Sequence, residues 1–186
     1  TTAEGLPMFD TFNDEDVKND QGILSTEDFT PYDGNLDPRL DWSVGRRGIP
    51  YLDWGLHNSF WIRDQSYGGP YSPKKMVYYQ AEAGTGNQVG YWGGGLSANN
   101  YSFIRYADVL LWRAEVAVNE GDLAKARELV NEVRARAANP DNWVKMDDGS
   151  DAANYVINEY PEGHSQFSNA SDALKAVQYE RRLELA

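Results

Sequence analysis

The sequence contains no cysteine. A disulfide framework, a thiolate metal site and a cysteine nucleophile are therefore excluded, although this absence says little about the cellular compartment. Long apolar runs are missing as well, since no stretch approaches the roughly 18–20 apolar residues that a membrane-spanning helix needs. The first residues do not show the charged and then apolar pattern of a secretory leader. The sequence gives no sign of a membrane-spanning segment.

Basic residues are scarce too. The chain carries 17 Lys and Arg residues against 29 Asp and Glu residues, which gives a formal net charge of −12. A charge of this sign repels nucleic-acid phosphates and anionic lipid headgroups, so nucleic-acid binding and direct membrane-surface binding are disfavoured. Aromatic residues, in contrast, make up 13% of the chain, and disordered chains are usually poor in them. We therefore expect a folded, loop-rich protein of one domain or part of one.

Residues 1–100 show no sustained helical or strand periodicity and hold most of the glycines and prolines. Residues 76–79 are the one strand-like run, flanked by Pro73 and Gly84, and we expect a short edge or hairpin strand there. The rest of this half is predicted to be a loop-rich aromatic segment.

Beyond Asn100 the pattern becomes helical. One apolar face is formed at offsets of 0, 3, 7, 10 and 14 by Ile104, Ala107, Leu111, Ala114 and Val118. The same offsets recur in Leu123, Ala126, Val130, Val133 and Ala137. Between them, Gly121 suits a left-handed C-cap and Asp122 an N-cap. Residues 101–138 are therefore predicted to form an antiparallel helical hairpin of tetratricopeptide type.

The segment after the hairpin is predicted to be irregular. Asn139 precedes Pro140, which ends the second helix, and residues 139–170 follow as a loop. Ser171 and Asp172 are candidate N-caps of a last helix over residues 171–186, which reaches Ala186 without a breaker. A single repeat needs about three neighbours for stability, so we expect the chain to be a portion of a longer protein. The fold class expected is mainly α, with extensive irregular loops and at most a few short β-strands.

Three motifs, taken in order, resemble the SusD/RagB family, which is named for starch-utilisation proteins of Gram-negative bacteria. They are residues 36–40 (LDPRL), residues 105–111 (RYADVLL) continuing through the hairpin to residues 131–137 (NEVRARA), and residues 180–186 (ERRLELA). The resemblance spans nearly all of residues 1–186 and identifies them as a partial C-terminal domain of that family.

The resemblance implies a lipid-anchored outer-membrane protein that faces outward and captures oligosaccharides or other nutrients. Its partner would be a SusC-like TonB-dependent transporter, and neither catalysis nor a cofactor is implied. The signal peptide and lipidated cysteine of such a protein would lie in a part outside this sequence. Because glycan contacts vary from member to member, the family assigns no ligand-binding residue here.

Aromatic side chains supply the ligand-site candidates, because sugar rings stack their C–H faces on aromatic rings. We expect ligand binding by Trp42, Trp54, Trp61, Tyr67, Tyr71, Tyr91 and Trp92. Glycine-rich surroundings make the last four of these the more exposed. The alternative is that most of them fill a core beneath the loops.

Charged residues of the family motifs are expected to form structural ion pairs across packed helices. The residues concerned are Arg105, Asp108, Glu115, Glu180, Arg181 and Arg182. We expect a charged residue of the last helix to meet one of the first helix of the hairpin.

No metal or catalytic site is expected. The acidic runs around Asp16 and Asp148 do not fit the ligand spacing of a calcium loop, and His57 and His164 lack a zinc-binding frame. Two other functions stay open. A glycoside hydrolase would need two carboxyls about 5–10 Å apart, for which Asp41, Asp53 and Asp64 are available. A tetratricopeptide-type scaffold would instead hold a peptide in its concave face.

Overall fold

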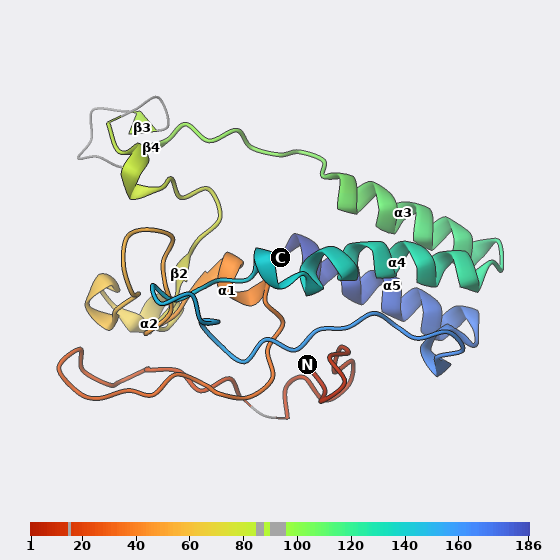
Figure 1. Ribbon diagram of the computed structural model, residues 1–186, viewed down its shortest axis with the longest axis horizontal. Coiled ribbons are helices and arrows are strands. Elements are labelled where there is room, and N and C mark those ends of the chain that lie inside the picture. The colour runs from red at the N-terminus through yellow and green to blue at the C-terminus, as the bar shows by residue number, and fades with distance from the viewer. Residues whose placement is uncertain (15, 85–87, 90–95) are drawn as a thin grey trace.

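The computed structural model describes residues 1–14, 16–84, 88–89 and 96–186 of the chain. Three helices lie together at one end, namely α3 (Tyr106–Asn119), α4 (Leu123–Ala138) and α5 (Ala170–Leu185) (Figure 1). The other end consists of irregular chain that carries short elements. This arrangement confirms the prediction of a mainly helical protein with extensive loops.

The short elements lie mostly before α3. Helices are α1 (Leu40–Ser43) and α2 (Gln65–Gly68), and 3₁₀ turns are η1 (Ser59–Trp61), η2 (Gln80–Glu82), η3 (Pro140–Asn142) and η4 (Ser165–Phe167). Strands are β1 (Val44–Gly45), β2 (Ser72–Pro73), β3 (Gln88–Val89) and β4 (Leu96–Ser97). β1 pairs with β2 in antiparallel register, Gly45 opposite Ser72, and β3 pairs with β4 in the same way.

The hairpin of α3 and α4 forms as predicted from its turn. Gly121 adopts a left-handed φ of 82°, and the Asp122 side chain accepts a hydrogen bond from the backbone N–H of Lys125 at 2.9 Å. α4 ends at Ala138, before Pro140. The expected faces meet in a core to which α5 also contributes. Its fully buried members include Leu111, Ala114, Ala126, Val130, Ala173 and Ala176.

One predicted helix boundary and one predicted strand are wrong. Residues 101–105 are not helical: Arg105 has an extended backbone, α3 begins at Tyr106, and Ile104 is 62% exposed instead of joining the core. Residues 76–79 are not a strand, because Met76 takes a left-handed φ of 68°, which interrupts an extended run. A side chain also binds the backbone of this run: Trp54 Nε1 donates a hydrogen bond to Tyr78 O at 2.9 Å.

The N-cap of α5 also differs from the prediction. Asn169, not Ser171 or Asp172, caps the helix: its Oδ1 accepts from the Asp172 backbone N–H at 3.0 Å, and its Nδ2 donates to the Asp172 carboxylate at 2.7 Å. Three neighbouring residues were all of capping type, so local chemistry alone did not distinguish them.

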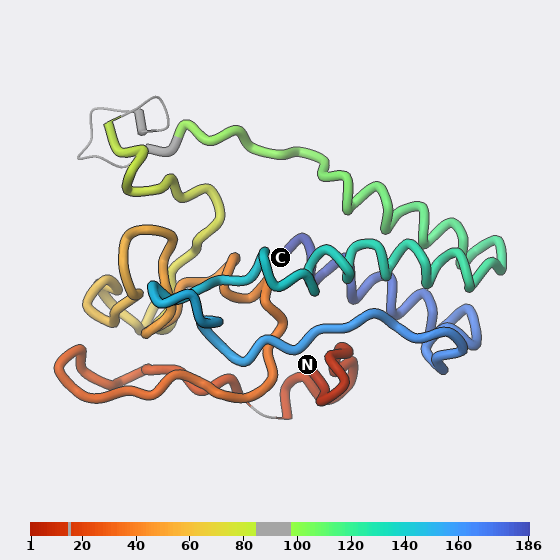
Figure 2. Tube along the Cα trace, viewed as in Figure 1, coloured from red at the N-terminus to blue at the C-terminus, as the bar shows by residue number. Residues whose placement is uncertain are grey.

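A second core joins two segments that are far apart in sequence. Leu36 and Tyr155 form a parallel bridge, and together with Ile49 and Val144 they are buried in one cluster. Figure 2 shows the chain after α4 running back along the bundle and passing the chain that leads into α1. The predicted loop of residues 139–170 is therefore irregular but packed.

Replacing the α5 cap should weaken the fold by a small, specific amount. Asn169→Ala is expected to lower the free energy of unfolding by about 1 kcal/mol, because the first turn of α5 loses an acceptor for a backbone N–H. Urea denaturation followed by circular dichroism measures this. Ser171→Ala is the matched control and should stay within about 0.5 kcal/mol, since Ser171 is exposed and does not cap the helix. The reverse order of the two effects would contradict this cap assignment.

Candidate ligand-binding site

Three of the predicted aromatic residues line one hollow. Trp61 ends η1, Tyr67 lies in α2 and Tyr71 precedes β2, and together they border a hollow of about 620 Å³, hereafter the aromatic hollow. Arg63 and Asp64 complete its rim. This volume falls within the range of small-molecule sites, about 300–1,000 Å³.

Local turns place the rings. Asp64 caps α2 by accepting the Ser66 backbone N–H at 2.9 Å, and Gly69 leaves the helix with a left-handed φ of 72°. The single turn of α2 projects Tyr67 into solvent, where it is 91% exposed, and the glycine turn returns the chain to Tyr71, which is 37% exposed. The glycine-rich surroundings of these two tyrosines therefore correctly indicated exposure.

Trp61 is held between the surface and the interior. Its ring meets His57 edge-to-face at 5.3 Å and Tyr51 at 5.5 Å between centroids. Edge-to-face contacts of this kind contribute about 0.5–1.5 kcal/mol each beyond burial. The ring of Trp61 is thus held in place by its neighbours, whereas the ring of Tyr67 extends into solvent.

A buried polar cluster lies beneath the aromatic hollow. His57 Nε2 is 2.9 Å from Ser72 Oγ, and the next residue of β2, Pro73, accepts from the Tyr51 hydroxyl through its carbonyl. Lys74 then donates to the carbonyl oxygens of Asp41 at 2.5 Å and Pro50 at 2.8 Å. These bonds fix the backbone of β2 and so the position of Tyr71.

Asp41 is the acceptor at the centre of this cluster. Its carboxylate is fully buried and accepts from Arg46 Nε at 2.6 Å, Arg46 Nη2 at 2.9 Å and the Tyr155 hydroxyl at 2.7 Å. Burial and the neighbouring Asp41 carboxylate raise the pKa of Tyr155. A buried carboxylate that is paired and fully hydrogen-bonded in this way is a structural group.

Burial also holds His57 neutral. Loss of hydration, aided by the positive charge of Lys74, lowers the pKa of His57 to about 4. Its Nδ1 has no hydrogen-bond partner within the described residues, so a proton added there would be poorly solvated. Loss of hydration likewise lowers the pKa of Lys74 to about 8, although Asp41 opposes the shift.

The remaining predicted aromatics do not join the aromatic hollow. Trp54 is partly buried, and its indole N–H donates a hydrogen bond to Tyr78 O. Trp42 is half-exposed, donates to Asn142 O at 2.7 Å and borders a different hollow beside Arg39 and Arg136. Tyr91 and Trp92 lie outside the described residues.

Several exposed aromatic residues were not among the sequence candidates. They are Phe60, Tyr79, Tyr101, Phe103 and Tyr106. Tyr101 and Phe103 stack edge-to-face at 5.2 Å and, with Trp42, border a hollow of about 550 Å³. Their alternation in the sequence, Tyr-Ser-Phe, is the signal that could have marked residues 101–103 as extended.

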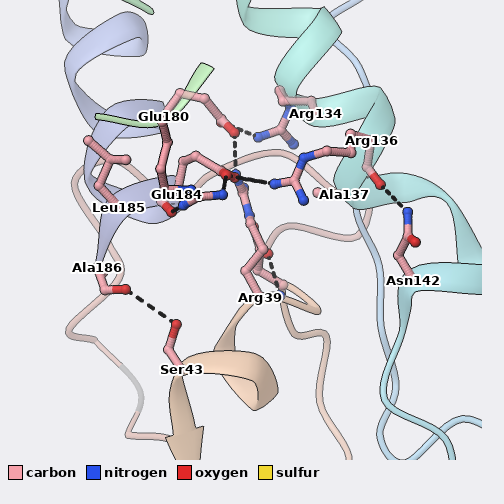
Figure 3. Close-up of polar contacts among 12 residues, drawn as sticks. Arg39, Ser43, Arg134, Arg136, Ala137, Asn142, Glu180, Glu184, Leu185 and Ala186 are labelled. Atoms are coloured by element: carbon pink, nitrogen blue, oxygen red, sulfur yellow. Dashed lines mark hydrogen bonds and ion pairs between the residues drawn. The ribbon is translucent and has the colours of Figure 1, made fainter. Parts of the chain in front are cut away.

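A buried ion network connects the bundle to the segment that carries the aromatic hollow (Figure 3). Glu180 on α5 is fully buried and lies 2.6 Å from Arg39 Nη1 and 2.7 Å from Arg134 Nη1. One turn later, Glu184 is approached by Arg136 at 2.6 Å, by Arg105 at 2.5 Å and by Arg39 at 3.1 Å. Arg39 precedes α1, so this network brings the start of α1 against α4 and α5.

The residues expected to form ion pairs divide into three groups. Arg181 Nε lies 2.8 Å from Asp108 Oδ1, which joins α5 to α3 as expected. Arg105 and Glu180 are paired, but with Glu184, Arg39 and Arg134, which were not among the candidates. Glu115 and Arg182 have no ion pair within the described part of the chain. The partners that were not predicted, Arg39, Arg134 and Glu184, lie in the same three family motifs, so the motifs themselves could have indicated them.

The carboxylates considered for hydrolysis are already engaged. Asp53 lies in an exposed loop, where desolvation raises its pKa but the hydrogen bonds from the backbone N–H groups of Ala81 and Gln80 prevail and lower it. The hydroxyl and the backbone N–H of Ser66 lower the pKa of Asp64. A general acid needs the opposite shift. Within the described residues, no three His, Asp or Glu side chains gather as a metal site would require.

The sequence matches a known protein family. A protein-family model described as the SusD family matches residues 5–186. The chain belongs to the SusD family. The resemblance read from the three motifs is thereby confirmed. Membership connects the chain with the binding of glycans or other nutrients during uptake at the outer membrane.

SusD-family members are generally non-catalytic cell-surface lipoproteins. No curated protein and no solved structure matches the chain. Among the helices of the described residues, none combines the length and the apolar character needed to cross a membrane.

Removing one partner of the fully buried Arg134–Glu180 pair should strongly destabilise the chain. Arg134→Ala leaves Glu180 with a single cationic partner and is expected to cost about 3–5 kcal/mol of unfolding free energy. Chemical denaturation measures this, and Arg182→Ala, an exposed arginine without an ion pair, is the control that should change stability by less than about 0.5 kcal/mol. Similar losses in both variants would show that the network does not carry this energy.

The lowered pKa of His57 predicts acid sensitivity. Between about pH 6.5 and pH 4 the unfolded chain binds a proton at His57 that the folded chain does not, so stability falls as the pH drops through this window. The His57 contribution is expected to be about 3 kcal/mol, measured as the difference between the pH profiles of the original chain and His57→Gln. Identical profiles for the two chains would refute a neutral His57.

Proposed function

We propose that the chain binds an oligosaccharide in the aromatic hollow, without chemical turnover, and delivers it to a SusC-like TonB-dependent transporter. The supporting observation is that Trp61, Tyr67 and Tyr71 border one open hollow. Aromatic rings offer flat apolar faces to the C–H faces of pyranose rings, while polar side chains at the rim bind hydroxyl groups.

The division between fixed and exposed rings suits capture followed by release. Trp61 is braced by Tyr51 and His57, so it provides a surface that does not need to be ordered on binding. Tyr67 is almost fully exposed and closes on a ligand at a small entropic cost. Few fixed contacts give modest affinity, and a ligand that must be passed to a transporter has to leave again.

Location and partner in this proposal rest on the family. In this proposal a lipid anchor holds the protein on the outer face of the outer membrane, where nutrient glycans arrive. The net charge of −12 adds no attraction to anionic lipid headgroups, which agrees with an anchor that is covalent and not electrostatic.

The two other functions are less well supported. A glycoside hydrolase would have to use carboxylates that the fold already employs as caps or buried acceptors. A peptide-binding scaffold has one observation in its favour, a smaller hollow of about 370 Å³ between α3 and α4 that is bordered by Tyr106, Leu110 and Arg136.

Substitution of the exposed rings tests the proposed site. Tyr67→Ala and Tyr71→Ala are each expected to weaken oligosaccharide binding about 2- to 10-fold, which corresponds to about 0.5–1.5 kcal/mol for one lost ring contact. Isothermal titration calorimetry, or quenching of tryptophan fluorescence, measures the affinity. Both tyrosines are exposed, so their removal leaves the core intact.

Tyr106→Ala is the matched control, because Tyr106 is also an exposed tyrosine, but it borders the α3–α4 hollow instead. It should leave glycan affinity unchanged. A loss of affinity in Tyr106→Ala alone would place the ligand between α3 and α4. Release of reducing sugar during incubation would make the chain a hydrolase.

A further inference from the structure

The cationic side chains of this chain are almost all engaged. All 17 Lys and Arg residues lie within the described part of the chain. Within that part, the side chain of each takes part in a hydrogen bond, an ion pair or an aromatic contact, except the side chains of Arg63, Arg113 and Arg182. In a protein with a large excess of carboxylates, a guanidinium without such a partner is the exception.

Arg63 differs from the other two in its surroundings. Arg113 lies on α3 and Arg182 on α5, both exposed on the helical bundle. Arg63 lies between η1 and α2, on the rim of the aromatic hollow, beside the rings of Trp61, Tyr67 and Tyr71. Arg63 therefore borders the same space as the proposed sugar-binding rings.

The neighbouring carboxylate does not neutralise Arg63. Asp64 borders the hollow as well, but it accepts hydrogen bonds from Ser66 and caps α2. No ion pair joins Asp64 to Arg63, although the two residues are adjacent. The guanidinium thus keeps its donors available to a ligand in the hollow.

An arginine in this position favours a particular ligand group. The planar guanidinium donates two parallel hydrogen bonds to groups with paired acceptor oxygens, such as a carboxylate or a sulfate ester. The overall negative charge of the protein does not attract anions from a distance, so recognition of such a group depends on this local contact.

We propose that the aromatic hollow selects acidic glycans, with Arg63 binding the carboxylate or sulfate of a sugar unit whose ring stacks on the aromatic walls. This inference rests on the proposed function and names its ligand class. Uronic acids and sulfated sugars share the chemistry that Arg63 recognises, and the experiment separates them.

The test compares charged and neutral ligands of matched backbone. Isothermal titration calorimetry with the 186-residue chain uses oligogalacturonate against its methyl ester, and sulfated dextran oligosaccharide against plain dextran oligosaccharide. One of the two charged ligands is expected to bind at least 10-fold more tightly than its neutral counterpart. Which pair shows the difference identifies carboxylate or sulfate as the recognised group.

Arg63→Gln is expected to remove this preference. Loss of a charge-assisted contact should weaken the charged ligand about 10- to 100-fold and leave the neutral one within about two-fold. Arg113→Gln is the matched control, since it removes the same charge from another exposed arginine without a partner. It should change neither affinity.

Three results would overturn the inference. Equal affinity for charged and neutral ligands, with binding lost in Tyr67→Ala but not in Arg63→Gln, would remove the charge selectivity and keep the proposed site. Equal weakening by Arg63→Gln and Arg113→Gln would mean diffuse electrostatic attraction. Absence of binding to all four ligands, or binding that Tyr67→Ala and Tyr71→Ala leave unchanged, would reject the proposed function together with the inference.

Discussion

Burial of two carboxylates on the last helix is the constraint on which the arrangement of the chain depends. Glu180 and Glu184 are removed from water, which costs several kcal/mol per charge unless cations compensate. The compensating arginines come from the chain before α1, from α4 and from the residue before α3. Each of these segments must therefore reach α5 before the carboxylates can be buried, and the network specifies one arrangement of the bundle and the loops.

The same constraint determines where the aromatic hollow lies. Arg39 is bound to α5, and α1 begins at the next residue, so Asp41 is carried to a fixed position. Asp41 and Lys74 then fix the backbone of β2, while His57 and Ser72 connect it to Trp61. A series of polar and aromatic contacts, joined by short stretches of chain, thus leads from the helical bundle to the proposed sugar-binding rings through segments with little regular secondary structure.

Features encoded by neighbouring residues were predictable, and features that depend on distant partners were not. Apolar spacing, Gly121 and Asp122 predicted the hairpin because helix periodicity and caps are local. The partners Arg39 and Glu180 are 141 residues apart, so no local pattern links them. In the site, glycine neighbours indicated the exposure of Tyr67 and Tyr71, whereas the burial of Trp54 follows from a carbonyl 24 residues away. The left-handed Met76 had no sequence signal.

Tyr67 stands on a single helical turn that contributes no buried residue to either core. Exchange of this side chain therefore alters the surface without disturbing the interior, and the same holds for Arg63 beside it. The molecule separates the positions that maintain its architecture from those that meet the environment. Under the proposed function, substitutions at these surface positions change which ligand is bound and leave the fold unaltered.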